Sequence, residues 1–273
     1  MLLSMPVSFA STSFFNIGIQ KNDTRDIKSL LDSQVRYANR TNFDKFISTY
    51  DESYINSDGF NLETYSNLVK DIWNSYDKIE YGIKIKSVVV KNDTANVEVT
   101  ENSKAKLQLN AKIDGTLESE SNSIYNLKKI NGKWKVVSDK ILDETTSLLY
   151  GEAKKLDIKL VAPQMINAGE EYTATLEFIP PENSIVIASI ASDKVEYPQK
   201  NAKEVYRKFP EDNILERIFR ANCDNVNEYV VASIALTKAD IDELNVKLSL
   251  TGFGYKIIRV NVVPKLNSEE CHD

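Results

Sequence analysis

The first third of the chain repeats apolar residues at helical spacing in three segments. The first starts at Asp26, with Asp23 or Thr24 placed to cap it, and its apolar positions are Ile27, Leu30, Leu31, Val35 and Ala38. A shorter segment holds Phe43, Phe46, Ile47 and Tyr50. Asn61 caps the third, whose stripe is Leu62, Tyr65, Leu68, Val69, Ile72, Trp73 and Tyr76. The spacing predicts three helices.

From Tyr81 onward the period changes from 3.6 to two, which is typical of strands. Apolar residues alternate from Tyr81 to Val90 with a slip at Ser87, and two further runs follow at 95–99 and 105–113. Asn131-Gly132 separates the runs 127–130 and 134–137, and both residues tolerate the positive φ of a type I′ turn. The pattern predicts an antiparallel meander with one wet face.

The second half contains only strand-like runs, bounded by turn residues. They lie at 158–160, 172–178, 185–190, 215–219, 229–236, 246–250 and 255–263. About seven short strands with turns between them are typical of an antiparallel sandwich. Residues 199–213 interrupt the pattern with a polar insertion, which is either a helix or a long loop.

Two resemblances follow from these elements. Three helices before a long meander, ending in Asn131-Gly132-Lys133-Trp134-Lys135-Val136-Val137-Ser138-Asp139, resemble the nuclear-transport-factor-2-like, or cystatin-like, cone superfamily. The stretch APQMINAGEEYTATLEF resembles the opening of bacterial immunoglobulin-like domains, although the Cys-Trp-Cys core pattern is missing. The expected fold is therefore α+β, a three-helix cone with a curved antiparallel sheet, followed by an all-β immunoglobulin-like sandwich.

The expected domain boundaries follow the same patterns. Residues 1–19 are predicted to be a signal-peptide remnant or an apolar arm. The cone is predicted at 20–147, the sandwich at 157–265 and a tail at 266–273. The segment 148–156 has no Ser, Gly or Pro run and so reads as a short connector.

Composition excludes several classes of chemistry. The 34 basic and 40 acidic residues give a net charge of −6, which disfavours nucleic-acid partners. The single histidine is the penultimate residue, His272, so no internal histidine can serve a triad or a helical metal site. Glycine-rich phosphate loops are absent. We therefore expect no cofactor and no metal site.

The two ends of the chain bear on its compartment. The opening MLLSMPVSFASTS has a short apolar run and a small-x-small end at Ser8-Phe9-Ala10, as at a signal-peptidase site, but no basic n-region. We expect an extracytoplasmic protein, secreted, periplasmic or at the cell surface, whose start codon is placed downstream of the true one. Cys223 and Cys271 then form one disulfide. The alternative is a cytoplasmic protein with two free thiols. No segment is long enough to span a membrane.

The resemblance to the cone family implies a pocket between the sheet and the helices. The residues expected to bind a ligand there are Tyr37, Tyr50, Tyr54, Trp73, Tyr125 and Trp134. Family members similar to ketosteroid isomerases use an Asp base and a Tyr donor, for which Asp51, Tyr50 and Tyr37 are the weak candidates here, with Asp44 explained by its place at a helix start. Aromatic residues at this spacing also serve simply as core.

The expected function is non-catalytic binding. We predict an extracytoplasmic binding or adaptor protein that uses the cone pocket and the sandwich to dock a small apolar molecule or a protein, with a homodimer through the cone sheet possible in the superfamily. The alternative is a small-molecule isomerase, cyclase or hydrolase that transfers protons with Asp and Tyr. An open cavity holding a buried carboxylate of raised pKa favours the enzyme, and a filled one favours docking.

Overall fold

The computed structural model describes residues 12–200, 203–242 and 245–265. Its helices are α1 (Thr12–Ala38), α2 (Phe43–Ile47), α3 (Leu62–Ser75) and the short 3-10 helix η1 (Glu152–Lys155). Asn61 caps α3 as predicted, because its side chain accepts a 2.9 Å hydrogen bond from the Thr64 backbone N–H. Within these ranges no helix is long and apolar enough to cross a membrane.

Helix α1 begins before the predicted start at Asp26. Residues 12–19 of the predicted N-terminal segment belong to it, while 1–11 lie outside the described residues. Asp23 therefore lies within the helix and is not its cap. Its buried Oδ1 instead accepts hydrogen bonds from Lys129 Nζ at 2.6 Å and from Trp134 Nε1 at 3.1 Å, which fixes α1 on the sheet.

Four long strands follow the helices as a meander. They are β1 (Glu80–Lys91), β2 (Thr94–Asn110), β3 (Ile113–Ile130) and β4 (Lys133–Gly151). The predicted slip at Ser87 is a register shift between Ile85 and Ser87. The predicted hairpin turn is also confirmed, with φ of 50° at Asn131 and 76° at Gly132. The two runs at 95–99 and 105–113 were expected as separate strands, but β2 carries the first and most of the second.

The described part of the second half contains eight strands, three of which are only two or three residues long. They are β5 (Lys159–Val161), β6 (Met165–Asn167), β7 (Glu171–Glu177), β8 (Ser184–Lys194), β9 (Arg207–Lys208), β10 (Ile214–Arg220), β11 (Glu228–Asp242) and β12 (Asn245–Val263). Strand β12 joins the two runs predicted at 246–250 and 255–263. The described part of the 199–213 insertion holds β9 and loop, with no helix.

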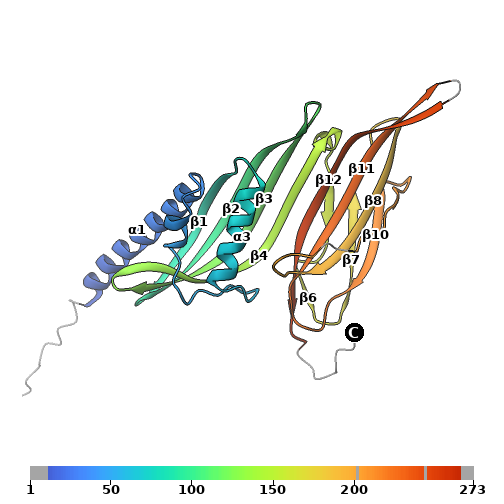
Figure 1. Ribbon diagram of the computed structural model, residues 1–273. Helices are drawn as coiled ribbons and strands as arrows, with labels where there is room; N and C mark the ends of the chain where they lie inside the picture. Colours follow the sequence, from blue (N-terminus) through green and yellow to red (C-terminus); the bar gives the residue numbers. More distant parts are fainter. Residues whose placement is uncertain (1–11, 201–202, 243–244, 266–273) are drawn as a thin grey trace, which may run out of the picture.

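The predicted fold class is wrong, because the two halves share one sheet. The strand order is β1-β2-β3-β4-β12-β11-β8-β9, with β6 added parallel to β12, and a second sheet has the order β10-β7-β5. Strand β4 pairs with β12 from Gly151 opposite Gly252 to Thr145 opposite Ile258. The molecule is mostly β, built on a large antiparallel sheet, and not a three-helix cone joined to a separate sandwich (Figure 1).

Glycines permit this junction at its end. Gly151 has a φ of 57°, and a Cβ built on it would lie 2.3 Å from the Thr251 carbonyl oxygen. A Cβ on Gly252 would lie 2.5 Å from the Ala153 backbone nitrogen. The chain can therefore leave β4 and enter η1 against β12 only where side chains are absent.

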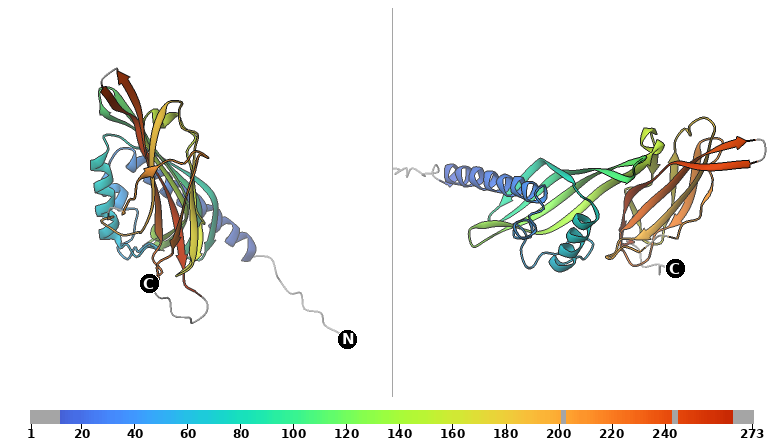
Figure 2. Two further views of the ribbon diagram at one scale, coloured as in Figure 1. Left: turned by 90° about the vertical axis from the view of Figure 1, so that its right-hand side faces the viewer. Right: turned by 45° about the horizontal axis from the view of Figure 1, so that its top comes forward.

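Two large apolar cores lie on this sheet, and Ile79, Ala105 and Leu117 form a third, smaller cluster. One large core lies between the helices and strands β1–β4, and the other lies between the part of the sheet formed by β8, β11 and β12 and the smaller sheet. Figure 2 shows the resulting elongated molecule, with the helices toward one end and the small sheet toward the other. In each core, the strands contribute every second residue, the one whose side chain points inward.

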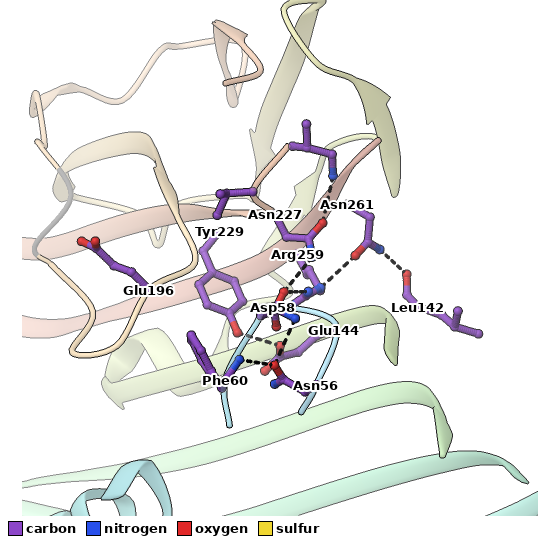
Figure 3. A network of polar contacts seen from close by, with 12 residues as sticks. Asn56, Asp58, Phe60, Leu142, Glu144, Glu196, Asn227, Tyr229, Arg259 and Asn261 are labelled. Atoms are coloured by element: carbon purple, nitrogen blue, oxygen red, sulfur yellow. Dashed lines mark hydrogen bonds and ion pairs between the residues drawn. The ribbon is translucent and has the colours of Figure 1, made fainter. Parts of the chain in front are cut away.

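A buried polar network, which we call the junction network, joins the two halves (Figure 3). Asp58, in the loop between α2 and α3, forms an ion pair with Arg259 of β12, and their side chains are 4% and 0% exposed. Asn227 Nδ2 donates a 2.7 Å hydrogen bond to the same Asp58 oxygen. Asn261 accepts from Arg259 Nε at 2.9 Å and donates to the Leu142 carbonyl at 2.7 Å. The network fixes how β12 meets the cone half.

Candidate functional site

The cone half holds a cavity of about 420 Å³ between the helices and the sheet. Helices α1, α2 and α3 form its roof, and β1–β4 form its floor. Most of its lining is apolar, and none of its described lining residues is a lysine, arginine or histidine. A cavity of this size, apolar with a few polar groups, is typical of a small-molecule site.

Three tyrosines pack together on the roof side. The rings of Tyr50, Tyr54 and Tyr65 lie with centroids 5.0 to 5.4 Å apart. The hydroxyls of Tyr50 and Tyr65 are 3.1 Å apart and share a hydrogen bond, and both side chains line the cavity. Burial raises the pKa of both phenols, so they are neutral near pH 7. One of the two hydroxyl protons forms the hydrogen bond between the tyrosines. The other hydroxyl proton can be donated to a ligand.

Two carboxylic acids, Glu101 of β2 and Glu144 of β4, lie on the cavity floor. Glu101 follows the buried residues Ala95, Val97 and Val99 at the same parity of β2, so it faces the helices. Its Oε1 accepts a 2.6 Å hydrogen bond from the hydroxyl of Tyr125 on β3.

Burial raises the pKa of Glu101 from 4.5 to about 7. The hydrogen bond from Tyr125 opposes this rise, and the charges of Asp139 and Glu144 add to it. The carboxyl group can therefore take up or release a proton close to neutral pH. This is the state in which a side chain transfers protons best.

Two carboxylates besides Glu101 lie on or near the floor. Asp139 accepts a short hydrogen bond from Tyr54, and burial raises its pKa to about 6. Glu144 of β4 lines the cavity and accepts a 3.1 Å hydrogen bond from Tyr229 of β11. Burial also raises the pKa of Glu144, while Arg259 acts to lower it. The mutual repulsion of these carboxylates favours protonation of Glu101.

The structure brings three of the six predicted ligand-binding residues to the cavity, namely Tyr50, Trp73 and Tyr125. Tyr37, Tyr54 and Trp134 pack in the surrounding core and are not among the residues that line it. Trp73 Nε1 donates a 3.0 Å hydrogen bond to the Tyr81 hydroxyl.

Of the weak catalytic candidates, only Tyr50 reaches the cavity. Asp51 lies in a turn where Ser53 donates to its carboxylate from both its backbone and its hydroxyl, at 3.0 and 2.6 Å. These bonds lower the pKa of Asp51, so it remains ionised at neutral pH and away from the cavity. Tyr37 packs beneath Lys45. The predicted Cys223–Cys271 disulfide depends on Cys271, which lies outside the described residues.

Sequence reasoning missed Glu101 and Tyr65. The signal for Glu101 was its parity, because it continues the inward-facing series of Ala95, Val97 and Val99. Tyr65 was assigned only to the apolar stripe of its helix. Its pairing with Tyr50 depends on how α3 crosses the sheet.

Comparison with known proteins gives partial structural likenesses only. No family model and no curated protein matches the sequence. A conserved protein from Planctomyces limnophilus is 11% identical with a TM-score of 0.39, over 44% of this chain and 94% of that one. A putative dehydratase of the NTF2-like family from Streptomyces avermitilis is 13% identical with a TM-score of 0.37, over 44% and 95%.

A Bdellovibrio bacteriovorus protein is 15% identical with a TM-score of 0.35, and the chain spans 39% of its length. The family that the sequence resembles is thus present among structures similar to part of this chain, and the immunoglobulin-like resemblance of the second half is not confirmed. At these identities and scores, the likenesses transfer no activity or substrate.

Proposed function

We propose that the protein transfers a proton within a small, largely apolar molecule bound in the cone cavity. The observation that carries this proposal is the position of the Glu101 carboxyl on the floor of an open cavity. Burial raises the pKa of this carboxyl to about 7. Such a group in an apolar cleft is a functional-site candidate on physical grounds, because burial without a cationic partner costs stability. It also meets the condition that favours the enzyme alternative.

The proposed reaction begins at a C–H bond that lies between a carbonyl group and a carbon–carbon double bond. The Glu101 carboxylate takes this proton, and the electron pair of the broken bond moves onto the carbonyl oxygen to form a dienolate. In the Tyr50–Tyr65 pair, the hydroxyl whose proton is not used between the two tyrosines donates a hydrogen bond to that oxygen. Glu101 then returns its proton to the far carbon of the original double bond. The carbonyl re-forms and the double bond moves into conjugation with it, which completes an isomerisation with no net loss or gain of atoms.

The surrounding residues hold Glu101 ready for this step. Tyr125 fixes the position of Oε1 through its 2.6 Å hydrogen bond. Asp139 and Glu144 keep its pKa high enough for it to accept a proton from carbon and release it again.

The test uses 5-nitrobenzisoxazole, a general probe for a carboxylate base in an apolar cleft. Removal of its ring C–H proton by Glu101 breaks the N–O bond and gives a coloured cyanophenolate. We expect kcat/KM to rise with pH through about 7, as Glu101 loses its proton. Glu101→Gln should lower kcat/KM by about 100-fold or more. Glu120→Gln, on an exposed position of β3, serves as the matched control.

The proposal is overturned if the wild type and Glu101→Gln consume the probe at equal rates. It is also overturned if the rate shows no inflection between pH 6 and 8. Unfolding of each variant in denaturant shows whether a lost rate comes from a lost fold.

The second candidate is ligand binding without turnover. The aromatic lining of the cavity favours it, because Tyr50, Tyr65 and Trp73 provide large apolar surfaces with polar ends. Under this proposal the protein is an extracytoplasmic binding or adaptor protein, whose location rests on the N-terminal sequence pattern alone. Saturable binding of an apolar probe together with no rate difference between wild type and Glu101→Gln would favour it.

A further inference from the structure

A second cavity, which we call the junction groove, lies beside the first. It has a volume of about 770 Å³ and is walled by β4, β11, β12, helix α3 and the segment that follows β8. Tyr197 of that segment donates a hydrogen bond to Asp71 of α3, which closes the wall between the two halves. Neither half of the chain could form this groove alone.

The cone cavity and the junction groove share part of their lining. Leu68 of α3, together with Glu144 and Thr146 of β4, lines both. Leu68 lies on the roof, and the other two lie on the floor. The two cavities therefore meet at β4, where the cone half joins the second half.

The register of the sheet gives both cavities one floor. Ser103 of β2 pairs with Ser119 of β3, and Ser119 pairs with Thr146 of β4. Thr146 pairs in turn with Ile257 of β12, which pairs with Val231 of β11. The first three of these line the cone cavity, and the last three line the junction groove.

This row sets the length of the floor. Neighbouring strands lie about 4.8 Å apart, so four steps from β2 to β11 span about 19 Å. The row starts as hydroxyl groups, with Thr146 Oγ1 donating to Ser119 Oγ at 2.8 Å, and ends on the apolar side chains of Ile257 and Val231. A molecule that follows it meets polar groups near Glu101 and apolar groups beyond β4.

The charges along the two cavities select against anions. Their described lining contains several carboxylates, Asp71, Glu101, Glu144, Asp193, Glu196 and Glu204, and one lysine, Lys200, which pairs with Glu196 at 2.8 Å. A carboxylate or phosphate on a ligand would lose its hydration here and meet mostly like charge, since the lysine is already paired with Glu196.

We propose that the cone cavity and the junction groove form one binding site for an elongated, mostly apolar molecule of about 19 Å that carries no anionic group. The part that reacts lies over Ser103 and Ser119 beside Glu101, and the apolar remainder lies over Ile257 and Val231. The position of the reacting part rests on the proposed function, whereas the binding of a long molecule across both cavities does not.

The test uses three rod-shaped fluorescent probes with one common body. These are diphenylhexatriene, its trimethylammonium derivative and its propionate derivative, titrated into the full chain. We expect the neutral and cationic probes to bind at least tenfold more tightly than the propionate. Ser103→Trp fills the cone end of the floor and Val231→Trp fills the groove end, so each should weaken the neutral rod at least tenfold.

Matched controls and a short probe sharpen the outcome. Lys104→Trp and Ile187→Trp add the same side chain at exposed positions outside both cavities and should leave binding unchanged. The short probe N-phenyl-1-naphthylamine should be lost in only one of the two plugged variants. If either tryptophan lowers thermal stability by unfolding the chain, Ser103→Phe and Val231→Phe replace it.

The proposal is overturned if only one plug weakens the rod, because the cavities would then act separately. It is also overturned if the propionate derivative binds as tightly as the neutral rod. These probes do not react, so a failure of turnover at Glu101 leaves this result intact, and a failure here leaves the Glu101 rate test intact.

Discussion

The cone cavity and the junction network both bury carboxylates, and they treat them in opposite ways. At the junction, Asp58 has a cation and an amide as partners, Arg259 and Asn227, and its side chain is 4% exposed. In the cavity, Glu101 has the phenol of Tyr125 as its neutral partner, faces open space and has a raised pKa. The junction network keeps its carboxylate ionised beside a cation, whereas the cavity holds a carboxyl group that can gain or lose a proton near neutral pH.

The difference separates structural from chemical polar groups. A buried charge that is paired with an opposite charge contributes to the orientation of the parts it joins. A buried acid without a cation is held in a state of balance, because the protein stabilises neither form strongly. At sites of the second kind, the free-energy cost of moving a proton to or from the side chain is small.

The largest expected effect is at the junction. Arg259→Met should lower the free energy of unfolding by about 3–5 kcal/mol, because Asp58 stays buried without its cation. The double variant Asp58→Asn/Arg259→Met should recover much of this loss, since it removes both charges. Denaturant unfolding of the three proteins measures the difference. A single variant as stable as the wild type would contradict the structural role of the pair.

The cavity should behave in the opposite sense. A carboxyl whose folded pKa lies above its unfolded value stabilises the fold fully below the unfolded pKa, here near 4.5, and loses that contribution as the pH rises to about 7. Glu101→Gln keeps a polar group for Tyr125 and never ionises. It should therefore be more stable than the wild type at pH 8 by about 3 kcal/mol, the free energy that corresponds to a pKa of about 7 in place of 4.5.

At pH 4.5 the two proteins should have nearly equal unfolding free energies, so the gain disappears on acidification. Unfolding in urea at a series of pH values measures this, with Glu120→Gln as the control that shows no such trend. A variant less stable than the wild type at pH 8 would show that the charged form of Glu101 is stabilised after all.

The smallest effect compares the removal of one neutral polar side-chain group in each of the two regions. Tyr50→Phe removes a hydroxyl that faces open space, where water can replace it for Tyr65, and should cost less than about 1 kcal/mol. Asn261→Leu leaves the Leu142 carbonyl and Arg259 Nε without their partner in a closed site, and should cost about 2 kcal/mol. Thermal unfolding measures both, and equal costs would remove the contrast between the regions.

Local patterns carried much of the element prediction. Asn61 capping α3, the slip at Ser87 and the Asn131-Gly132 turn were all predicted and confirmed, because each depends on residues close in sequence. The start of α1 was missed, since Asp23 has its partners Lys129 and Trp134 more than a hundred residues away. A capping signal could not be told apart from a long-range polar contact.

The sequence predicted a pocket between the helices and the sheet, but it identified only some of the residues that line the cavity found there. Tyr50, Trp73 and Tyr125 were named and line the cavity, whereas Asp51 was named for its chemistry and lies in a turn. Glu101 could have been found by extending the parity of Val97 and Val99 by one step. Its raised pKa could not, because that depends on burial beneath helices and on Asp139 and Glu144 from another strand.

The sequence by itself determined the helices, most of the strands, the turns between them and the absence of an internal histidine. These follow from spacing, from backbone preferences and from composition, which are local or additive properties. Only the tertiary structure decided that β4 pairs with β12, that Asp58 pairs with Arg259 and that two cavities share one floor. The reason is that strand pairing and burial join residues far apart in the chain, and hydrophobic periodicity records which face is buried without recording what buries it.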